Sequence, residues 1–131
     1  MNILIVDDDP GFRLMLQSLL LLEGWIVEAA ENGRDALERM SQRDHDMVIS
    51  DIYMPVMDGI KFHRALRAQP KYERLPFLFI SAYDDEHTMS AVQDPSIEGF
   101  LKKGRPVNVM KAWIKYLLTP EEDRPKVPPG K

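Results

Sequence analysis

Short apolar runs alternate along this chain with longer stretches in which apolar residues recur at helical spacing. Continuous apolar runs occur at Ile3 to Val6, Met47 to Ile49 and Phe77 to Ile80. They are too short for helices and are typical of strands that are covered on both faces. Trp25 to Ala30 and Gly99 to Lys102 have a similar character. The pattern therefore predicts five strands.

A helix is predicted after each strand. Asp9 and Pro10 form an N-cap followed by proline at the first helical position, Gly24 can end that helix, and Asp58 can cap the third. The fourth helix, expected from about Asp84 to Val92, is the most polar. Five strand–helix repeats indicate a parallel sheet, because parallel neighbours need crossovers and helices form them. The residues expected to face the sheet are Phe12, Met15, Leu16, Leu19 and Leu20, then Ala36, Leu37 and Met40, then Phe62, Ala65 and Leu66, then Thr88, Met89 and Val92, and finally Met110, Trp113, Ile114 and Leu117.

Two segments lack this pattern. Gln69 to Pro76 is bounded by prolines and is predicted to be a loop. Residues 119 to 131 are rich in proline and charge, with almost nothing to bury. We expect one folded domain over residues 1–118, followed by a proline-rich charged tail or linker over residues 119–131.

Composition narrows the possible function classes. A chain of 131 residues is long enough for one domain with a proper core. The formal net charge of −4 gives no basic face for nucleic acid, so direct nucleic acid binding by this chain is not expected. The absence of cysteine excludes disulfides and thiolate metal sites. With no signal peptide and no apolar run of membrane-spanning length, we expect a cytoplasmic protein without a membrane segment. His45, His63 and His87 lack partners at metal-ligand spacing and are expected at the surface.

Polar side chains follow four of the predicted strands at the point where each strand ends. Asp7 and Asp8 follow the first strand, Asp51 the third, Ser81 the fourth and Lys103 the fifth. In an open parallel sheet these strand ends share one edge, so the side chains should converge. Converging carboxylates repel one another unless a cation lies among them, and oxygen ligands without His or Cys favour Mg²⁺. The cluster predicts a Mg²⁺ site open to a phosphoryl group. Lys103 and Ser81 can contact phosphoryl oxygens, and Asp51 is left as the nucleophile.

At these motifs the chain resembles the receiver domain of two-component response regulators, the family that includes stand-alone chemotaxis-type regulators. The matching motifs are Ile5-Val6-Asp7-Asp8, the block Asp51 to Gly59 with its Met-Pro and Asp-Gly pairs, Ser81-Ala82, and Phe100 followed by Lys102-Lys103. The resemblance covers about residues 1 to 118. It implies an α/β fold with a doubly wound five-stranded parallel sheet, five helices and the flavodoxin-like strand order 2-1-3-4-5.

The resemblance also implies phosphoryl chemistry at the acid cluster. Asp51 would accept a phosphoryl group from the phosphohistidine of a sensor histidine kinase or a phosphotransfer protein. Mg²⁺ would be held by Asp7, Asp8 and Asp51 together with the backbone carbonyl of Tyr53, and Lys103 would pair with a phosphoryl oxygen. Such a phosphoprotein catalyses its own phosphorylation and dephosphorylation and is otherwise not an enzyme.

The same resemblance implies a phosphorylation-activated signalling switch. Ser81 would be the switch hydroxyl, and Phe100 the aromatic residue that turns inward behind it. Phosphorylation would change the surface around the fourth helix, the fifth strand and the helix of Trp113. Output would pass to a downstream protein or a tethered output domain, and a phosphorylation-dependent homodimer is one route. The motifs do not identify the cognate kinase or the target.

Three positions near the site distinguish this chain from others in the family. Gly104 stands where a proline usually follows the site lysine, so a cis peptide is not expected there. The two positions that tune phosphoryl lifetime in the family are Tyr53, two residues beyond Asp51, and Tyr83, two residues beyond Ser81. We hypothesise that these rings hinder the attacking water and lengthen the life of the acyl phosphate.

Two other interpretations fit parts of the pattern. In a haloacid-dehalogenase-type phosphatase, Asp7 would be the nucleophile and Asp9 the acid, but the chain is short for that fold. The block Asp51 to Gly59 would then have no role. In a degenerate receiver the domain would only bind partners, although the acid, serine and lysine set is complete. Labelling by acetyl phosphate on Asp51, on Asp7 or on neither separates the three interpretations.

Overall fold

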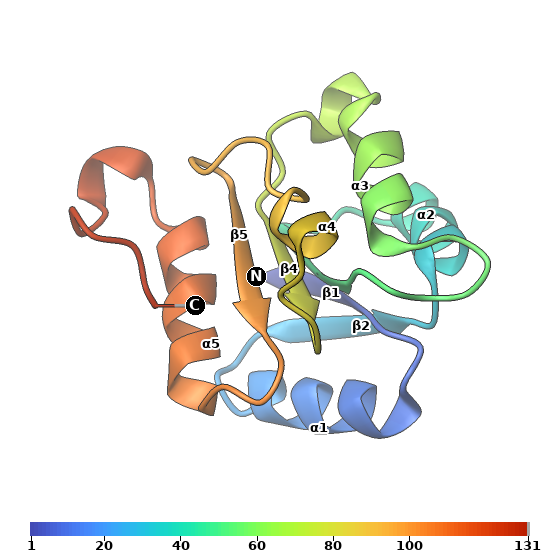
Figure 1. Cartoon of the computed structure of the whole chain (residues 1–131), viewed down its shortest axis with the longest axis horizontal. Helices are drawn as coiled ribbons and strands as arrows, with labels where there is room; N and C mark the ends of the chain where they lie inside the picture. The colour runs from blue at the N-terminus through green and yellow to red at the C-terminus, as the bar shows by residue number, and fades with distance from the viewer. Residues whose placement is uncertain (131) are drawn as a thin grey trace.

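The computed structural model describes residues 1–130 and contains five strands, five α-helices and two 3-10 helices (Figure 1). In chain order they are β1 (Asn2–Val6), α1 (Pro10–Leu21), β2 (Ile26–Ala30), α2 (Gly33–Gln42), β3 (Met47–Asp51), α3 (Gly59–Arg67), η1 (Pro70–Tyr72), β4 (Phe77–Ser81), α4 (Glu86–Met89), β5 (Glu98–Lys102), α5 (Val107–Leu118) and η2 (Glu121–Asp123). The predicted alternation of five strands and five helices is confirmed. Within the described residues, no helix has the length and apolar character needed to cross a membrane.

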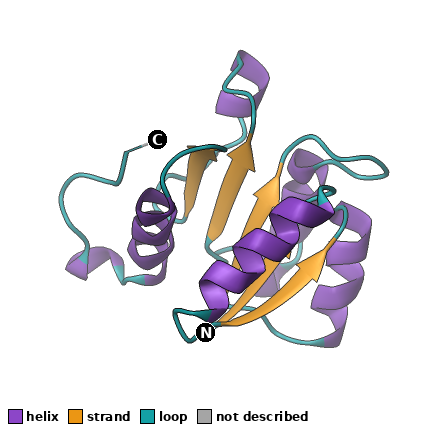
Figure 2. Ribbon diagram, turned by 90° about the horizontal axis from the view of Figure 1, so that it is seen from below, coloured by secondary structure: helices purple, strands orange, loops and turns teal. Residues whose placement is uncertain are grey.

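The strands form one parallel sheet in the order β2-β1-β3-β4-β5. Helices cover both faces of this sheet (Figure 2). Residues of α1 and α5 pack on one face, and residues of α2 and α3 pack on the other. The strand order and the two helical layers confirm the predicted doubly wound, flavodoxin-like fold.

Side chains of the central strands alternate between two cores. Ile3 and Ile5 of β1 pack with α1 and α5, whereas Leu4 and Val6 pack with α2 and α3. All four are fully buried. Because both faces of the sheet are covered, the strand needs an unbroken apolar run rather than an alternating one.

Four helices begin with a side-chain cap. Asp9 and Asp58 accept hydrogen bonds from backbone N–H groups at 2.9 and 2.8 Å, which confirms both predicted caps. Asn32 and Asp85 cap α2 and α4 in the same way. The carboxylates of Asp9 and Asp58 therefore act as N-caps of α1 and α3, the two helices that follow the acidic strand ends.

The predicted extent of the fourth helix, Asp84 to Val92, is wrong. The helix α4 spans only Glu86–Met89, and Met89 is 41% exposed rather than buried. After Met89 the backbone tightens into a turn in which the Ala91 N–H donates to the Thr88 carbonyl at 3.1 Å. The Gln93 N–H then donates to the Glu98 carboxylate at 2.7 Å, whereas a longer helix would direct it to the Met89 carbonyl.

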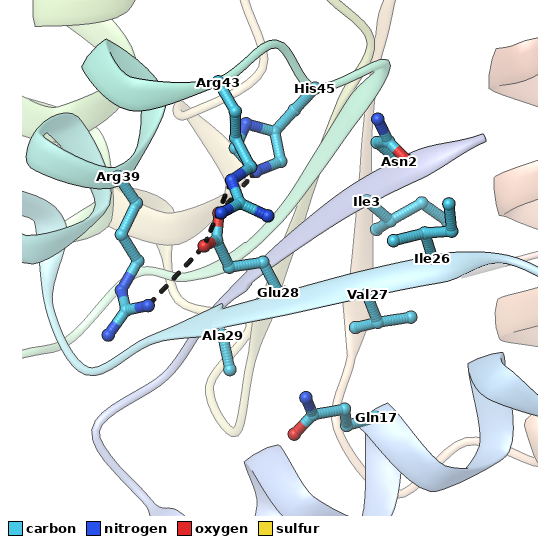
Figure 3. Close-up of a pocket in the computed structure, with 10 residues that line it drawn as sticks. All are labelled: Asn2, Ile3, Gln17, Ile26, Val27, Glu28, Ala29, Arg39, Arg43 and His45. Atoms are coloured by element: carbon cyan, nitrogen blue, oxygen red, sulfur yellow. Dashed lines mark hydrogen bonds and ion pairs between the residues drawn. The ribbon is translucent and has the colours of Figure 1, made fainter.

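Two of the three histidines expected at the surface are buried, which corrects that prediction. His45 is 6% exposed, and its Nε2 lies 2.8 Å from Glu28 Oε1 (Figure 3). His63 is fully buried and hydrogen bonds to Glu98. His87 is exposed as expected. Each buried histidine has a carboxylate partner on a distant strand, and no spacing along the chain indicates such a partner.

Two smaller differences concern helix faces and one loop. Met15 is 47% exposed and Ala65 is only half-buried, because both lie at the margin of their helix's apolar stripe. The predicted loop from Gln69 to Pro76 contains η1. Its Tyr72 is buried and donates to the Met40 carbonyl at 3.0 Å, which anchors the loop to α2.

Residues 119–130 turn back after α5 through η2, and their far end lies beside α5 (Figure 1). The indole Nε1 of Trp113 donates to the Gly130 carbonyl at 2.7 Å. The described part of the proline-rich segment therefore contacts the folded domain.

Candidate functional site

The acidic residues predicted to converge lie together at one edge of the sheet. Asp7 follows β1 directly and Asp51 ends β3, and these two strands are neighbours. One carboxylate oxygen from each of Asp7, Asp8 and Asp51 lies within 4.8 Å of the others. Asp7 and Asp51 are buried, whereas Asp8 is exposed. The cluster therefore has two buried carboxylates, those of Asp7 and Asp51, and one that is open to solvent, that of Asp8.

Local hydrogen bonds hold the two buried acids in place. Asp51 Oδ1 accepts from the backbone N–H of Ile52 at 2.7 Å, and the Ser50 hydroxyl donates to the Asp51 carbonyl at 2.8 Å. Asp7 Oδ1 accepts from the backbone N–H of Asp9 at 2.9 Å. Each acid thus uses one oxygen within its own loop and keeps the other for the site.

Lys103 bridges these remaining oxygens. Its Nζ lies 2.9 Å from Asp51 Oδ2 and 2.7 Å from Asp7 Oδ2, and it lies over the Phe12 ring, 4.5 Å from the centroid. Burial lowers the pKa of Lys103, but the two carboxylates outweigh burial and raise that pKa overall. Burial raises the pKa of Asp51 and the Asp7 charge adds to this, while Lys103 opposes it. The cluster of three carboxylates therefore contains a single ammonium group, that of Lys103.

The donor set fits a hard divalent cation. Asp7 Oδ2 is buried and, although close to Lys103 Nζ, makes no hydrogen bond of good geometry. Buried carboxylate oxygens need a partner, and the three acids exceed the single ammonium in charge. Asp7, Asp8 and Asp51 offer only oxygen ligands, which suit Mg²⁺ better than a transition metal.

Of the two predicted switch residues, Ser81 is joined to the site through Lys103, and Phe100 lies in the core. Ser81 is fully buried, and its hydroxyl accepts from the backbone N–H of Tyr83 at 3.1 Å. The Lys103 backbone N–H donates to the Ser81 carbonyl at 2.8 Å, which joins the end of β4 to the loop after β5. Phe100 is 3% exposed and packs in the α2–α3 core. In this structure the hydroxyl of Ser81 is bonded within its own loop and not to Asp51.

Two tyrosine rings stand next to each other beyond the strand ends. Tyr53 and Tyr83 form an edge-on pair with 5.5 Å between ring centroids, and they are 40% and 60% exposed. The Tyr53 hydroxyl donates to the Asp85 carboxylate at 3.0 Å. The Tyr53 ring is therefore tied to the start of α4. Tyr53 and Tyr83 come from the loops that follow the phosphoacceptor candidate and the switch candidate.

Two residues near the acids were missed by the sequence reasoning. Arg13 Nη1 donates to the Asp7 carbonyl at 2.6 Å, and Phe12 provides the ring under Lys103. Phe12 was predicted only to face the sheet. The position of Phe12 and Arg13 along the chain indicates their place near the acids. The helix α1 starts directly after the Asp7 loop, so its first turn must lie at the same sheet edge.

A separate pocket lies away from the acids. It has a volume of about 480 Å³ and lies along the edge strand β2, where Arg39 and Arg43 lie 3.7 and 3.8 Å from the carboxylate of Glu28 (Figure 3). None of the predicted site residues lines it. Glu28 is the only carboxylate among the lining residues, so this pocket holds no cluster of acids like that of Asp7, Asp8 and Asp51.

Comparison with known proteins finds matches to one protein family. Residues 3–115 match the sequence model of the response regulator receiver domain. The chain is 43% identical over 102 residues to an uncharacterized response regulatory protein of Vibrio cholerae, covering 75% of this chain and 38% of that protein. It is 32% identical over 118 residues to a probable chemotaxis protein CheY of Rhizobium etli, covering 89% of this chain and 92% of that protein.

A solved structure agrees with these sequence matches. The response regulator protein TrrA of Thermotoga maritima, in complex with Mg²⁺-BeF, is 30% identical, with a TM-score of 0.76 over 88% of this chain and 97% of that chain. The chain spans nearly all of the Rhizobium etli protein but well under half of the Vibrio cholerae one. The shared region thus occurs both as most of a protein and as part of a longer one.

Proposed function

This chain belongs to the response regulator receiver domain family, and on that premise we propose that Asp51 is its phosphoacceptor and Lys103 the residue that neutralises the transferred group. A single observation carries the proposal: Lys103 Nζ lies 2.9 Å from Asp51 Oδ2 and 2.7 Å from Asp7 Oδ2. A lysine so placed can pair with a phosphoryl oxygen as soon as one is attached to Asp51.

The chain's own residues account for the transfer. An Asp51 carboxylate oxygen attacks phosphorus, an O–P bond forms, and the P–N bond of the donor phosphohistidine breaks. The imidazole leaves with the bond electrons and is protonated from solvent. Lys103 offsets the negative charge on the phosphoryl oxygens. The remaining rate acceleration comes from positioning the donor in line with Asp51, because phosphoryl transfer requires little covalent catalysis by the protein.

A divalent cation would complete the charge balance. Asp7, Asp8 and Asp51 would hold Mg²⁺, together with the backbone carbonyl of Tyr53. When bound, Mg²⁺ neutralises phosphoryl charge and orients the transferred group. The buried oxygen of Asp7 that lacks a well-directed hydrogen bond supports this assignment.

The switch is proposed to run through Ser81 and Phe100. The Ser81 hydroxyl would leave the Tyr83 N–H and donate to the phosphoryl group, and Phe100 would follow into the space behind it. The result would be a changed surface over α4, β5 and α5. Catalysis by this chain would be limited to its own phosphorylation and dephosphorylation.

Partners and organisation follow from the family. The phosphoryl donor would be a sensor histidine kinase or a phosphotransfer protein in the cytoplasm. Output would pass to a separate protein, as in chemotaxis-type relatives, or to a tethered domain, with or without a homodimer. Residues 1–118 would form the receiver domain and residues 119–131 a tail or linker, which agrees with the matched region 3–115.

No observation favours the phosphatase alternative. Asp9, its proposed acid, accepts hydrogen bonds from the first backbone N–H groups of α1. The region 3–115 that matches the receiver family includes the block Asp51 to Gly59, which the phosphatase alternative leaves without a role.

The test is phosphorylation by acetyl phosphate with Mg²⁺, read by intact mass and peptide mapping. The parent is expected to gain one phosphoryl group on Asp51, and chelation of Mg²⁺ should abolish the gain. Asp51→Asn should gain none. The matched control is Asp58→Asn, which alters a helix cap and should still be labelled. Label on Asp7, or no label on a folded parent, would refute the proposal.

A further inference from the structure

The side chain of Lys103 has a third neighbour besides the two carboxylates. Its Nζ lies over the Phe12 ring, 4.5 Å from the centroid, and 2.9 and 2.7 Å from the carboxylate oxygens of Asp51 and Asp7. The electron-rich face of an aromatic ring attracts an ammonium, and the attraction grows when both groups are shielded from water. The Lys103 side chain is only 19% exposed. The ring therefore helps to hold a largely desolvated ammonium.

The start of α1 fixes the place of the Phe12 ring. Phe12 lies in the first turn of α1, and its backbone N–H donates to the carboxylate of the N-cap Asp9 at 3.4 Å. The Gly11 N–H donates to the same carboxylate at 2.9 Å. Arg13, the next residue, donates from Nη1 to the Asp7 carbonyl at 2.6 Å. These hydrogen bonds join the first turn of α1 to the loop that carries the acids, so the ring stays beside them.

The backbone after Lys103 gives its side chain little support. Gly104 has a φ of +92°, which glycine adopts without steric cost, and a Cβ atom there would meet no non-neighbouring atom of residues 1–130 within 4 Å. Arg105 and Pro106 are exposed. On the strand side, the Lys103 N–H donates to the Ser81 carbonyl at 2.8 Å. This bond anchors the backbone of Lys103 but leaves its long side chain to be placed by its own contacts.

The ring and the two carboxylates differ in how a bound cation would affect them. Asp7 and Asp51 are proposed ligands of Mg²⁺, so their oxygens would be shared between that cation and the Lys103 ammonium. Mg²⁺ takes oxygen ligands, and a phenyl ring offers none. The Phe12 ring therefore stays available to the ammonium when the carboxylates are engaged elsewhere.

We propose that Phe12 is a positioning residue for Lys103, whose ring keeps the ammonium at the sheet edge beside Asp51 even when a cation engages the carboxylates. This inference rests on the proposed role of Lys103 in phosphoryl transfer to Asp51. Phe12 acts through Lys103 and takes no part in making or breaking bonds. Because the attraction between the ring face and the ammonium performs this role, a change in the electrons of the ring at nearly constant shape should displace Lys103.

The first test observes Lys103 in the full chain by NMR, without a phosphoryl donor. The ε-methylene protons of Lys103, assigned by their loss in Lys103→Met, should be displaced by the ring current of Phe12. Site-specific replacement of Phe12 by trifluorophenylalanine nearly keeps the shape of the ring but weakens the attraction of its face for a cation. The displacement should then fall by about half or more, because the ammonium leaves the ring. An unchanged displacement would mean that shape alone places Lys103 and would overturn the proposal.

The second test measures the rate of Asp51 labelling by acetyl phosphate at saturating Mg²⁺. The rate should fall in steps from phenylalanine through mono- and difluorophenylalanine to trifluorophenylalanine, by about fivefold in all, and Phe12→Leu should be about as slow as the last. Met15→Ala is the matched control, because Met15 lines with Phe12 the same cavity of about 210 Å³ but has no ring. Its rate should stay near that of the parent. Labelling of the parent at a rate that ignores the fluorine series would overturn the proposal.

A double-mutant cycle separates the contact with Lys103 from any other role of Phe12. In the Lys103→Met background, Phe12→Leu should slow labelling no further, because the group that the ring positions is gone. An equal loss in both backgrounds would show that Phe12 acts independently of Lys103 and would overturn the proposal. If Phe12→Leu does not fold, the fluorinated residues, which nearly keep the size of the ring, replace it in the cycle. A parent that takes up no label on Asp51 refutes the proposed function, and the ring-current measurement then still decides whether Phe12 positions Lys103.

Discussion

Gly59 lies so close to the backbone of Asp51 that a Cβ atom on it would fall 2.0 Å from the Asp51 carbonyl oxygen. Its N–H also donates to the Ile52 carbonyl at 2.8 Å. The Asp-Gly pair of the motif therefore has two separate roles. Asp58 caps α3, and Gly59 lets the start of α3 pack directly on the end of β3.

Gly59→Ala is expected to lower the free energy of unfolding by about 3 kcal/mol and to slow labelling of Asp51, because the added methyl displaces the loop backbone. Urea unfolding and acetyl phosphate labelling measure the two effects. Gly11→Ala is the control, since a Cβ there meets only the Asp9 side chain at 3.4 Å. That change should be neutral or stabilise by about 0.5 kcal/mol. A parent-like Gly59→Ala would show that the close approach is unimportant.

Lys103→Met is expected to slow phosphorylation of Asp51 by about a hundredfold, because it removes a preorganised charge that faces the phosphoryl oxygens. It should also strengthen Mg²⁺ binding by about tenfold, since the cation no longer competes with an ammonium for Asp7 and Asp51. Melting temperature against Mg²⁺ concentration measures that binding.

Lys102→Met is the matched control for this change. Lys102 precedes the site lysine, and its Nζ lies 3.7 Å from Asp84 in an exposed ion pair. Such pairs contribute little, so phosphorylation and Mg²⁺ binding should stay near the parent values. Equal losses in the two variants would point to a general charge effect instead of a contact at the site.

Glu98→Gln is expected to destabilise the protein by about 2–4 kcal/mol at neutral pH, because it leaves buried donors without their charged acceptor. Glu98 accepts from His63, from Arg67 Nη2 at 2.8 Å and from the Gln93 N–H at 2.7 Å. Burial alone would raise the pKa of Glu98, but the hydrogen bonds from His63 and from backbone N–H groups outweigh it and lower the pKa to about 2.

The pH dependence of this effect has a definite sign. The stabilisation from ionised Glu98 is complete above its ordinary pKa of 4.5 and is lost as the pH falls from there towards 2. Burial lowers the pKa of His63, so protonation of the unfolded chain below pH 6.5 adds to the acid destabilisation. Urea unfolding from pH 7 to pH 3 should show the gap between Glu98→Gln and parent narrowing. The exposed Glu73→Gln should show no gap, and a gap independent of pH would contradict this account.

Much of the fold could be predicted because its signals are local. A strand covered on both faces must be apolar throughout, and Ile3 to Val6 shows this directly. Polar site residues lie at or just after the ends of β1, β3, β4 and β5, and parallel topology brings those ends together. Asp7, Asp51 and Lys103 could therefore be placed at one site from their order along the chain.

What could not be predicted depends on partners distant in sequence. His63 and Glu98 are 35 residues apart, and neither has a patterned neighbour that identifies the other. Beyond the end of α4, the Gln93 N–H donates to Glu98 instead of to a helical carbonyl. The position of the Trp113 ring, whose Nε1 donates to the Gly130 carbonyl, depends on Gly99, and the missing side chain of Gly99 gives no hydrophobic signal. In these places tertiary contacts overrode the local pattern.

Tyr53→Asn and Tyr83→Ala are each expected to speed the loss of phosphoryl from Asp51, because the two rings form an edge-on pair beside the strand ends where water must approach. A tenfold faster loss corresponds to a barrier lower by about 1.4 kcal/mol, which is within the reach of one removed ring. Tyr53→Phe is the control: it deletes the hydroxyl that donates to Asp85 at 3.0 Å but keeps the ring. If the ring blocks water, Tyr53→Phe should retain the parent lifetime, whereas a hydroxyl effect transmitted through Asp85 to α4 would shorten it as much as Tyr53→Asn does. The labelled protein is freed of acetyl phosphate and its remaining phosphorylated fraction is followed by intact mass with Mg²⁺ present. Unchanged lifetimes in both Tyr53→Asn and Tyr83→Ala would rule out shielding by these rings, and would leave Lys103 and the acids as the groups that set the lifetime.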